Sequence, residues 1–535
     1  MAKEHLVNDD TVKATNEILS KMLSSIREVN GTGVTEYGTA YVIGQESTDG
    51  YRCYRKNGVL TMASSTLNGD STFPYKYSSG AGTTACVNSY KECTDFPNFN
   101  PQKVTSRAGT FKRIERFYYG TQYIGVYMIN WVCAEKLYDW YKLPRDFYWK
   151  GELYWNYVDI GCYEGAEERI DGTNYLVSKV GYHPAHNRTR TQFETYAENW
   201  HSLLSTDTDK EFYHITTISE WTEILTPIIE ILLASRNAQN TTTGYMGSCY
   251  LYERYCPIAG YEVDEDAGTT TLYIQQYTSG STSYDTTIRT GGSVNLCTAS
   301  SSSDEGTGVD EHTDSAYAQC LSATKSSGTI NDTSYTHIIV IDKVIDGAEG
   351  YTRVNSHPWK TGECDYDYTN TYAWRNSGNA SCLNGDDGCY ENAGYYPFKI
   401  LGIENVWGNM WKNILNVTIQ NYVPYVCTDI SNWTDTTTPE TNSYFEQVNY
   451  SVCTKSSSYV TEIGEDSEHS DVKLPTAVGG ASNKYYADYY WISSSYKTCY
   501  AGGPLVNGLY DGLFCFNLNN AVGNSNWNNG ARLSL

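Results

Sequence analysis

Short runs in which apolar and polar side chains alternate predict strands in several parts of this chain. They include residues 37–43, 111–119 and 123–131, where Tyr, Phe, Ile and Val recur at short intervals. Such alternation places the apolar side chains on one face of an extended chain. Residues 32–109 as a whole are rich in Gly, Ser, Thr and Tyr, and we expect a small β-rich region there.

An amphipathic helix is predicted near the beginning of the chain, over residues 9–29. Its apolar side chains follow a heptad spacing; they are Val12, Leu19, Met22, Ile26 and Val29. A lone helix with so narrow an apolar stripe is marginal in water until the stripe is buried. It can pack on its own body, form a homotypic coiled coil or dock into a larger assembly. We expect one of the last two, and assign residues 1–31 to attachment or oligomerisation.

Two further helices are predicted by capping boxes, in which a Thr is followed three residues later by Gln or Glu. The box at residues 189–192 opens a helix toward residue 204, and the box at residues 217–220 opens one toward residue 239. The second helix carries an apolar stripe that predicts packing against a core. That stripe consists of Ile218, Trp221, Leu225, Ile228 and Leu232. We expect Pro227 to kink this helix.

Two long segments interrupt this pattern. Residues 240–395 are rich in Ser, Thr and Gly and poor in helix formers, which predicts an insertion of short strands and loops. Residues 430–480 predict a second, smaller insertion. The expected organisation is therefore an N-terminal helix over 1–31, a small β-rich region over 32–109, and one large domain over 110–535 that carries both insertions.

The chain of 535 residues contains 50 Tyr, which is its main compositional anomaly. One interpretation is a Tyr-rich β core, because Tyr has a high strand propensity. The other is a binding surface, because Tyr, Ser, Gly and Asn supply rigid rings and adaptable hydrogen bonds at paratopes. Both interpretations are kept at this point.

The net charge of −24 bears on the possible partners. A field of that sign repels nucleic acid and anionic membranes, so we expect neither as a partner. We expect no membrane insertion either, because no run approaches the roughly 18 apolar residues that a transmembrane helix needs. Residues 1–10 lack the apolar stretch of a secretory signal, which predicts synthesis in the cytoplasm. The 16 Cys form no close CxxC pairs and are expected to be mostly reduced and partly buried.

The C-terminal part of the chain contains a series of short motifs in one order. Residues 159–165 read Asp-Ile-Gly-Cys-Tyr-Glu-Gly, and residues 184–190 read Pro-Ala-His-Asn-Arg-Thr-Arg. Residues 402–411 read Gly-Ile-Glu-Asn-Val-Trp-Gly-Asn-Met-Trp. A Tyr-, Ser- and Asp-rich segment follows at 484–500, and the final stretch at 508–535 contains Gly-Leu-Phe and Gly-Ala-Arg-Leu.

This order resembles the C-type-lectin-like fold of the formylglycine-generating-enzyme superfamily and of the variable proteins of diversity-generating retroelements, which include phage tropism determinants. The resemblance covers residues 110–535 and implies an α+β fold with two helices and short antiparallel sheets. It also implies a rigid frame near the end of the chain. The frame residues would be Trp407, Gly408, Asn409, Trp411, Gly512, Phe514, Asn517, Trp527, Gly530 and Arg532.

The same resemblance implies a variable display face in front of that frame. Copying of template adenines with errors turns Asn codons into Tyr, Ser, Asp and related codons in such proteins, and the residues here are of that kind. The predicted ligand-binding residues are Tyr485, Tyr486, Asp488, Tyr489, Tyr490, Ser494, Tyr496, Tyr500, Asn507, Tyr510 and Asp511. An outward patch of Tyr is costly unless it binds something.

Enzymatic alternatives receive little support from the sequence. An oxidase of the formylglycine-generating type would need a copper-binding Cys pair, but Cys499 and Cys515 do not match its spacing or surroundings, and buried thiols are the simpler interpretation. His183 and His186 have a spacing that can bind metal on a helix, but Pro184 lies between them. Glu404 can coordinate a cation or cap backbone groups, and we expect the latter. We therefore predict no catalytic residue, no metal and no cofactor.

The function expected from the sequence is that of a phage virion adhesin, a receptor-binding or fibre protein that works without chemical turnover. Its partner would be a host-surface protein or glycan, and its N-terminal region would contact other virion proteins. A homotrimer is expected, because fibres are commonly threefold. The alternatives are a decoration or fibre protein without a receptor role and, less in keeping with the motifs, the oxidase.

Overall fold

The computed structural model describes residues 33–63, 96–149, 152–153, 155–203, 212–237, 255–279, 281–284, 286–288, 290–298, 317–347, 350–362, 366–367, 398–494 and 496–535. Of the described residues, 46% lie in strands and 12% in helices, the latter including two α-helices. The predicted α+β class is therefore wrong, and the protein is mostly β. The physical reason is that the segments expected to hold only short strands and loops pair into larger sheets, including a closed barrel. The helix predicted over 9–29 lies outside the described residues.

The first sheet has the strand order β3-β2-β1-β7-β6. Its strands are β1 (Thr35–Val42), β2 (Tyr51–Lys56), β3 (Val59–Met62), β6 (Tyr118–Ile124) and β7 (Tyr127–Cys133). The run 123–131, predicted as one strand, is a β6–β7 hairpin instead, because Gly125 adopts φ +59° and reverses the chain. Strand β1 pairs with β7, so hydrogen bonding crosses the domain boundary expected after residue 109.

A second sheet has the order β13-β34-β10-β5-β4. It consists of β4 (Gln102–Ser106), β5 (Gly109–Glu115), β10 (Tyr157–Gly161), β13 (His214–Ile215) and β34 (Leu533–Ser534). Two hairpins accompany it: β8 (Tyr148–Trp149) with β9 (Glu152–Leu153), and β11 (Ala166–Ile170) with β12 (Thr173–Val177). The last strand, β34, thus lies between β10 and β13. Ser534 pairs with Ile160 of β10, some 370 residues earlier in the sequence, and with His214 of β13, some 320 residues earlier.

Both predicted capping boxes form. The Thr189 N–H donates to Gln192 Oε1 at 2.9 Å, and the helix α2 (Arg190–Leu203) follows. The Thr217 N–H donates to Glu220 Oε2 at 3.0 Å and opens a π-helical segment (Glu220–Leu225) that continues as α3 (Thr226–Leu233). This second helix ends earlier than the predicted residue 239, because Ala234 takes a left-handed conformation.

Short 3₁₀ turns connect several of the elements. They are η2 (Pro97–Phe99), η3 (Arg145–Phe147), η8 (Ile430–Asn432), η9 (Pro439–Thr441) and η10 (Gly508–Tyr510).

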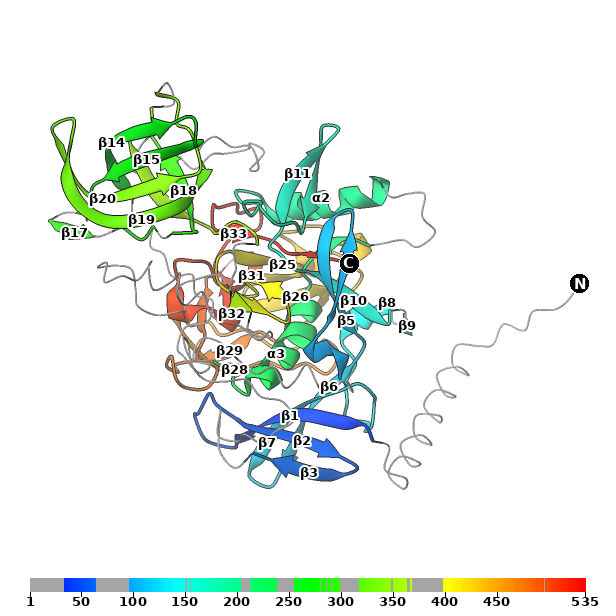
Figure 1. Ribbon diagram of the computed structural model, residues 1–535. Helices are drawn as coiled ribbons and strands as arrows, with labels where there is room; N and C mark the ends of the chain where they lie inside the picture. Colours follow the sequence, from blue (N-terminus) through cyan, green and yellow to red (C-terminus); the bar gives the residue numbers. More distant parts are fainter. Residues whose placement is uncertain are drawn as a thin grey trace, which may run out of the picture.

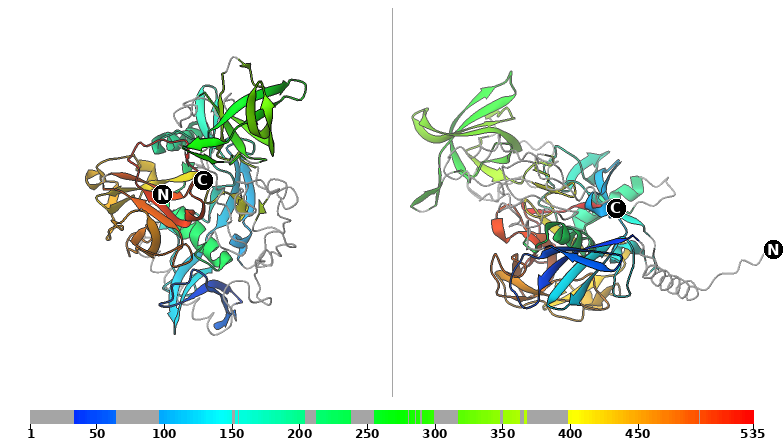
Figure 2. Two further views of the ribbon diagram at one scale, coloured as in Figure 1. Left: turned by 90° about the vertical axis from the view of Figure 1, so that its left-hand side faces the viewer. Right: turned by 60° about the horizontal axis from the view of Figure 1, so that its bottom comes forward.

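The segment expected as the first insertion contains a closed barrel of the order β14-β15-β20-β19-β18-β21. Its strands are β14 (Cys256–Asp264), β15 (Thr269–Ile274), β18 (Ser293–Cys297), β19 (Tyr317–Ile330), β20 (Thr333–Ile341) and β21 (Arg353–His357). Alternate residues such as Leu272, Ile274, Ile339 and Ile341 fill its interior. A small hairpin of β16 (Tyr277–Ser279) and β17 (Thr282–Tyr284) accompanies it. The barrel and the first sheet lie at opposite ends of the molecule (Figures 1 and 2).

The central element is a nine-stranded sheet of the order β27-β26-β25-β31-β32-β30-β28-β29, with β33 paired to β25. Its strands are β25 (Trp411–Gln420), β26 (Val423–Cys427), β27 (Phe445–Gln447), β28 (Ser458–Ile463), β29 (Pro475–Val478), β30 (Tyr489–Ile492), β31 (Lys497–Gly502), β32 (Gly512–Leu518) and β33 (Asn529–Gly530). A three-stranded sheet of β22 (Tyr366–Asp367), β23 (Phe398–Ile400) and β24 (Ile403–Glu404) precedes it. The predicted insertion 430–480 thus supplies three strands to the main sheet.

Most of the predicted frame residues are buried here. Trp407 and Asn409 are fully buried, Trp411 and Arg532 nearly so, whereas Asn517 is half-buried. The Arg532 guanidinium donates to the carbonyls of Gly161, Glu404 and Asn405 and so ties three separate segments together.

Candidate functional site

Strand β30 divides the predicted display segment between two faces of the central sheet. Its burial alternates, with Tyr490 and Ile492 in the main core and Tyr489 and Trp491 partly exposed on the other side. The Tyr490 hydroxyl donates to the Cys453 carbonyl at 2.9 Å, so even its polar end is satisfied inside the protein. This alternation follows from the two-residue period of a strand.

The outward rings of this region form one group, which we call the aromatic face and define as Tyr459, Tyr489, Trp491 and Tyr510. Tyr489 is central, because its ring centroid lies 4.3 Å from that of Tyr510, 4.7 Å from Trp491 and 5.0 Å from Tyr459. Tyr510 is 39% exposed, and the other three are partly buried. The Tyr489 hydroxyl donates to the Ser457 carbonyl at 2.7 Å, which holds the central ring in place.

A buried aromatic layer supports the aromatic face from the side of the sheet. Trp491 packs edge-on against Trp411 with centroids 5.7 Å apart, and Trp411 lies 6.3 Å from Tyr500. The Tyr500 hydroxyl accepts hydrogen bonds from the Asn529 amide at 3.1 Å and the Asn524 amide at 3.4 Å. Tyr500, predicted to contact a ligand, therefore supports the face from below and is fully buried.

The two predicted carboxylates also lie inside the protein. Asp488 is fully buried, and its Oδ2 accepts the Phe514 N–H at 2.7 Å. Burial raises the pKa of Asp488 well above its usual range. Burial, followed by the proximity of Asp488, likewise raises the pKa of Asp511, although Lys412 acts in the opposite direction. Burial therefore removes Asp488, Tyr490, Tyr500 and Asp511 from the predicted contact set, because a fully covered side chain cannot touch a partner.

Tyr485 and Tyr486 attach the segment to its neighbours. The Tyr485 hydroxyl donates to Glu46 Oε1 at 2.9 Å, and Lys484 forms an ion pair with the same Glu46. The Tyr486 ring packs on Phe514 with centroids 4.6 Å apart, under the guanidinium of Arg236. These contacts link the display segment to the turn that follows β1 and to the end of α3.

The remaining predicted residues lie at the edge of this region. Ser494 and Tyr496 are exposed in the turn between β30 and β31, and Asn507 is half-buried before η10. Of the predicted set, the structure thus places Tyr489 and Tyr510 in the aromatic face. Tyr459 was not predicted, because it lies in the supposed second insertion. Trp491 was not predicted either, although strict alternation from Tyr489 would have placed Trp491 on the same face.

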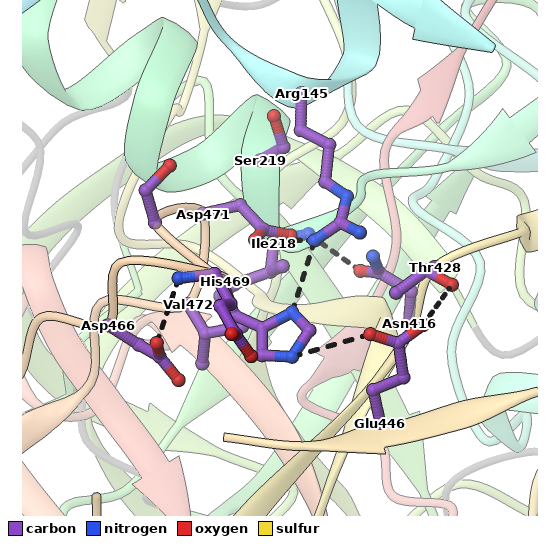
Figure 3. Close-up of polar contacts among 12 residues, drawn as sticks. Arg145, Ile218, Ser219, Asn416, Thr428, Glu446, Asp466, His469, Asp471 and Val472 are labelled. Atoms are coloured by element: carbon purple, nitrogen blue, oxygen red, sulfur yellow. Dashed lines mark hydrogen bonds and ion pairs between the residues drawn. The ribbon is translucent and has the colours of Figure 1, made fainter. Parts of the chain in front are cut away.

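A second candidate is a partly buried polar network around Arg145, shown in Figure 3. Its Nη1 lies 3.1 Å from Asp471 Oδ1 and 3.3 Å from His469 Nδ1, and His469 Nε2 lies 3.5 Å from Glu446 Oε2. Glu223 Oε2 accepts the backbone N–H of Arg145 at 2.7 Å. The network thus joins η3, the π-helical segment and the 466–472 loop to one another.

An adjacent group of acids has strongly shifted ionisation. Burial raises the pKa of Glu194 to about 8 and, together with Glu220, that of Asp146 to about 7. For His214, burial lowers the pKa, but Glu220 at 3.2 Å outweighs it and raises the pKa to about 9. Such shifts often mark catalytic sites. Here Glu194, His214 and Glu220 are buried and Asp146 is partly buried, so the group is better described as a structural junction between α2, β13 and η3.

The thiols and histidines singled out from the sequence do not form a metal centre. Cys499 packs into the main core, whereas Cys515 belongs to the cluster around Trp411 on the other face of the sheet. One ion cannot bridge side chains on opposite faces. Burial raises the pKa of Cys499 to about 12. In the described part of the chain, no group of three or more His, Cys, Asp or Glu is placed to hold a metal ion.

Glu404 has the capping role that was expected of it. Its Oε2 accepts the Gly362 N–H at 2.7 Å.

Comparison with known proteins adds no identity. No family model matches the chain, and no curated protein is significantly similar to it in sequence. Within the described ranges, no helix is long and apolar enough to cross a membrane.

Proposed function

We propose that this protein is a recognition protein of a phage virion, an adhesin that binds a host-surface protein or glycan through the aromatic face. The observation that carries the binding proposal is the contact of Tyr489 with Tyr459, Trp491 and Tyr510 on one partly exposed surface. The order of motifs along the chain supports the assignment to a virion. The proposal involves no chemical turnover.

The rings of the aromatic face are already ordered before a partner binds. The rings already pack on one another, and Tyr489 is hydrogen-bonded to Ser457, so binding costs little side-chain entropy. Aromatic rings dominate binding energy at interfaces, because they bury a large area with few rotatable bonds. Ring faces can stack on a sugar or an apolar peptide side chain, while the hydroxyl of Tyr510 orients it. A net charge of −24 disfavours a polyanionic partner.

The presence of several copies of the protein on one particle would strengthen attachment to the host cell. Several copies on one particle convert weak single contacts into firm attachment, because each further contact becomes intramolecular. We include a homotrimer and attachment through residues 1–31 in the proposal, on the basis of the heptad spacing of residues 9–29.

Substitution in the aromatic face tests the binding proposal. We expect Tyr510→Ala and Tyr489→Ala to weaken the binding of the purified protein to host cells by roughly 5- to 30-fold each, as truncation of a hot-spot ring costs about 1–2 kcal/mol. The measurement is a titration of labelled protein on cells, with thermal unfolding of each variant alongside.

Tyr444→Ala is the matched control, because Tyr444 is also exposed, at 48%, but lies outside the aromatic face. It should bind like the wild type. If the two aromatic-face variants remain folded and bind as well as Tyr444→Ala, the aromatic face is not the binding site.

A further inference from the structure

Three histidines meet where the β14–β21 barrel joins the rest of the molecule. His357 is the last residue of β21, and Tyr317 beside it is the first residue of β19, so both belong to the barrel. His183 and His186 come from the loop between β12 and α2, and Trp527 comes from the segment before β33. We call these five residues the histidine junction. Figure 1 shows the barrel projecting from the body at this place.

The rings of the histidine junction are in mutual contact. The His357 centroid lies 4.4 Å from Tyr317, 5.0 Å from His186, 6.1 Å from His183 and 6.2 Å from Trp527. His357 is 1% exposed and His186 fully buried. The contact therefore brings imidazoles from the body against an imidazole from the barrel, in a buried environment that screens a charge poorly.

The hydrogen bonds suit neutral rings. His186 Nε2 lies 2.8 Å from the Tyr317 hydroxyl, and its Nδ1 lies 3.2 Å from the Pro184 carbonyl. A neutral imidazole donates through one nitrogen and accepts through the other, which fits both partners. Among the described residues, neither ring nitrogen of His357 has a hydrogen-bond partner of normal geometry, and only the adjacent Pro358 backbone favours the protonated ring. A proton added to His357 would therefore create a buried charge with little compensation.

The charged groups near the histidine junction oppose such a proton as well. Arg188 follows His186 in the same loop, and its positive charge disfavours a second one at His186. Arg188 is itself paired with Glu167 at 2.8 Å, which partly offsets its charge, so burial remains the main cause that opposes a proton on His186. His183 and His186 act in the same direction on His357.

We propose that the histidine junction is an acid-sensitive latch: protonation of His357 and His186 at mildly acidic pH releases the barrel from the body. The proposal goes beyond host binding and does not depend on the aromatic face. The closed junction accepts a proton only at a large cost, whereas the open junction exposes ordinary, solvated imidazoles. Acid therefore favours the open form.

The direction and size of the pH effect on opening follow from the difference in histidine pKa between the closed and open forms. Burial first, then Arg188, lowers the pKa of His186 from 6.5 to about 4, and burial followed by the neighbouring histidines lowers the pKa of His357 well below 6.5. The stabilisation of the closed form is complete above pH 6.5 and is lost as the pH falls toward the lowered pKa. At pH 5, His186 alone increases the opening equilibrium constant about 20-fold relative to pH 7. His357 adds to this in the same direction.

Hydrogen exchange of the full chain tests the latch. Exchange rates are divided by the intrinsic rates at each pH, and peptides covering 181–188 and 353–362 are compared with barrel peptides from β19 and β20. We expect the 181–188 and 353–362 peptides to gain at least tenfold in relative exchange between pH 7.5 and pH 5. The β19 and β20 peptides should change little, because the barrel remains closed.

The variant His357→Phe keeps a ring of similar shape and cannot take a proton, so it should remove much of the acid response. His186→Gln is the second variant, since an amide can still pair with the Tyr317 hydroxyl. His201→Gln is the matched control, because His201 is a partly buried histidine on α2, away from the junction. It should respond to acid like the wild type.

Three results would overturn the proposal. The first is an unchanged exchange of the 181–188 and 353–362 peptides at pH 5. The second is an acid response that persists in both His357→Phe and His186→Gln. The third is a parallel gain in the β19 and β20 peptides, which would mean that the barrel unfolds. Host-cell binding of His357→Phe at neutral pH should equal that of the wild type, so failure of the latch and failure of the aromatic face are separate outcomes.

Discussion

At the scale of single residues, side chains of one type have opposite roles within a few positions of one another. Tyr489 and Tyr490 are adjacent, yet Tyr489 lies in the aromatic face and Tyr490 in the main core. Both were predicted to bind a ligand, because composition cannot distinguish the two faces of a strand. Asp488 shows the same limit, since a carboxylate expected at the surface is fully buried.

Asp488 leads to a prediction about pH. Burial raises its pKa in the folded protein, so the folded state holds a proton that the unfolded state loses near pH 4. The stability contributed by this proton falls as the pH rises above about 4. We expect Asp488→Asn to raise the free energy of unfolding at pH 7 by at least about 1 kcal/mol, since one pKa unit corresponds to 1.36 kcal/mol. Urea unfolding at pH 4 and pH 7 measures this, and the gain should vanish at pH 4.

Asp466→Asn is the control with the opposite sign. Burial acts to raise the pKa of Asp466, but N–H groups of Asn449 and Glu468 at 2.7 and 2.9 Å outweigh it and lower the pKa. The stability it contributes is present above pH 4 and lost in acid, so this variant should be destabilised at pH 7. Equal effects of the two substitutions at pH 7 would show that the two carboxyl groups do not differ in ionisation.

At the scale of elements, the starts of the helices were predictable and their ends were not. Each start depends on a Thr and an acid or amide three residues later, so the signal is contained within four positions. The end of α3 depends on Ala234 adopting φ +53°. An Ala does not predict this left-handed conformation, as a Gly would have done. Short strands were expected within residues 240–395, but their closure into a barrel was not. Segments rich in Ser and Thr become strands only when partners are available.

The two capping boxes should differ in their contribution to stability. In the exposed box of α2, we expect Thr189→Ala to cost about 1 kcal/mol. Thr217→Ala should cost more, about 2 kcal/mol, because the fully buried Thr217 hydroxyl also donates to Asp146. Chemical denaturation of both variants tests this ranking. A larger loss for Thr189→Ala would mean that the buried Thr217–Asp146 hydrogen bond contributes little.

At the scale of the whole molecule, the central sheet and its neighbours are closed by residues that are distant in sequence. Strand β34 lies between β10 and β13, and Arg532 just before it binds carbonyls of β10 and of the 404–405 turn. The resemblance noted in the sequence marked Arg532 as a frame residue, and it is 1% exposed. The resemblance did not reveal that the overall architecture is mostly β, because strand pairing between distant segments leaves no local pattern in the sequence.

Arg532 tests how strongly this closure stabilises the molecule. We expect Arg532→Met to lower the free energy of unfolding by about 3–5 kcal/mol, because three buried carbonyls lose their donor. Arg532→Lys should remain clearly destabilised, since an ammonium group cannot reproduce the planar fork of the guanidinium. Thermal and urea unfolding provide the measurement. A loss below about 1 kcal/mol in Arg532→Met would show that the closure depends on β34 alone.

The sequence by itself determined the features that neighbouring residues decide: the two helix starts, several strands, and the richness in Tyr that makes an aromatic face possible. Only the tertiary structure decided which rings are exposed, because that depends on the sheet face that packs against the core. It also brought Tyr459 to Tyr489, and His357 of the barrel to His186 of the body. Such contacts join residues tens to hundreds of positions apart, and their energy depends on the packing of the intervening chain, which no local pattern records.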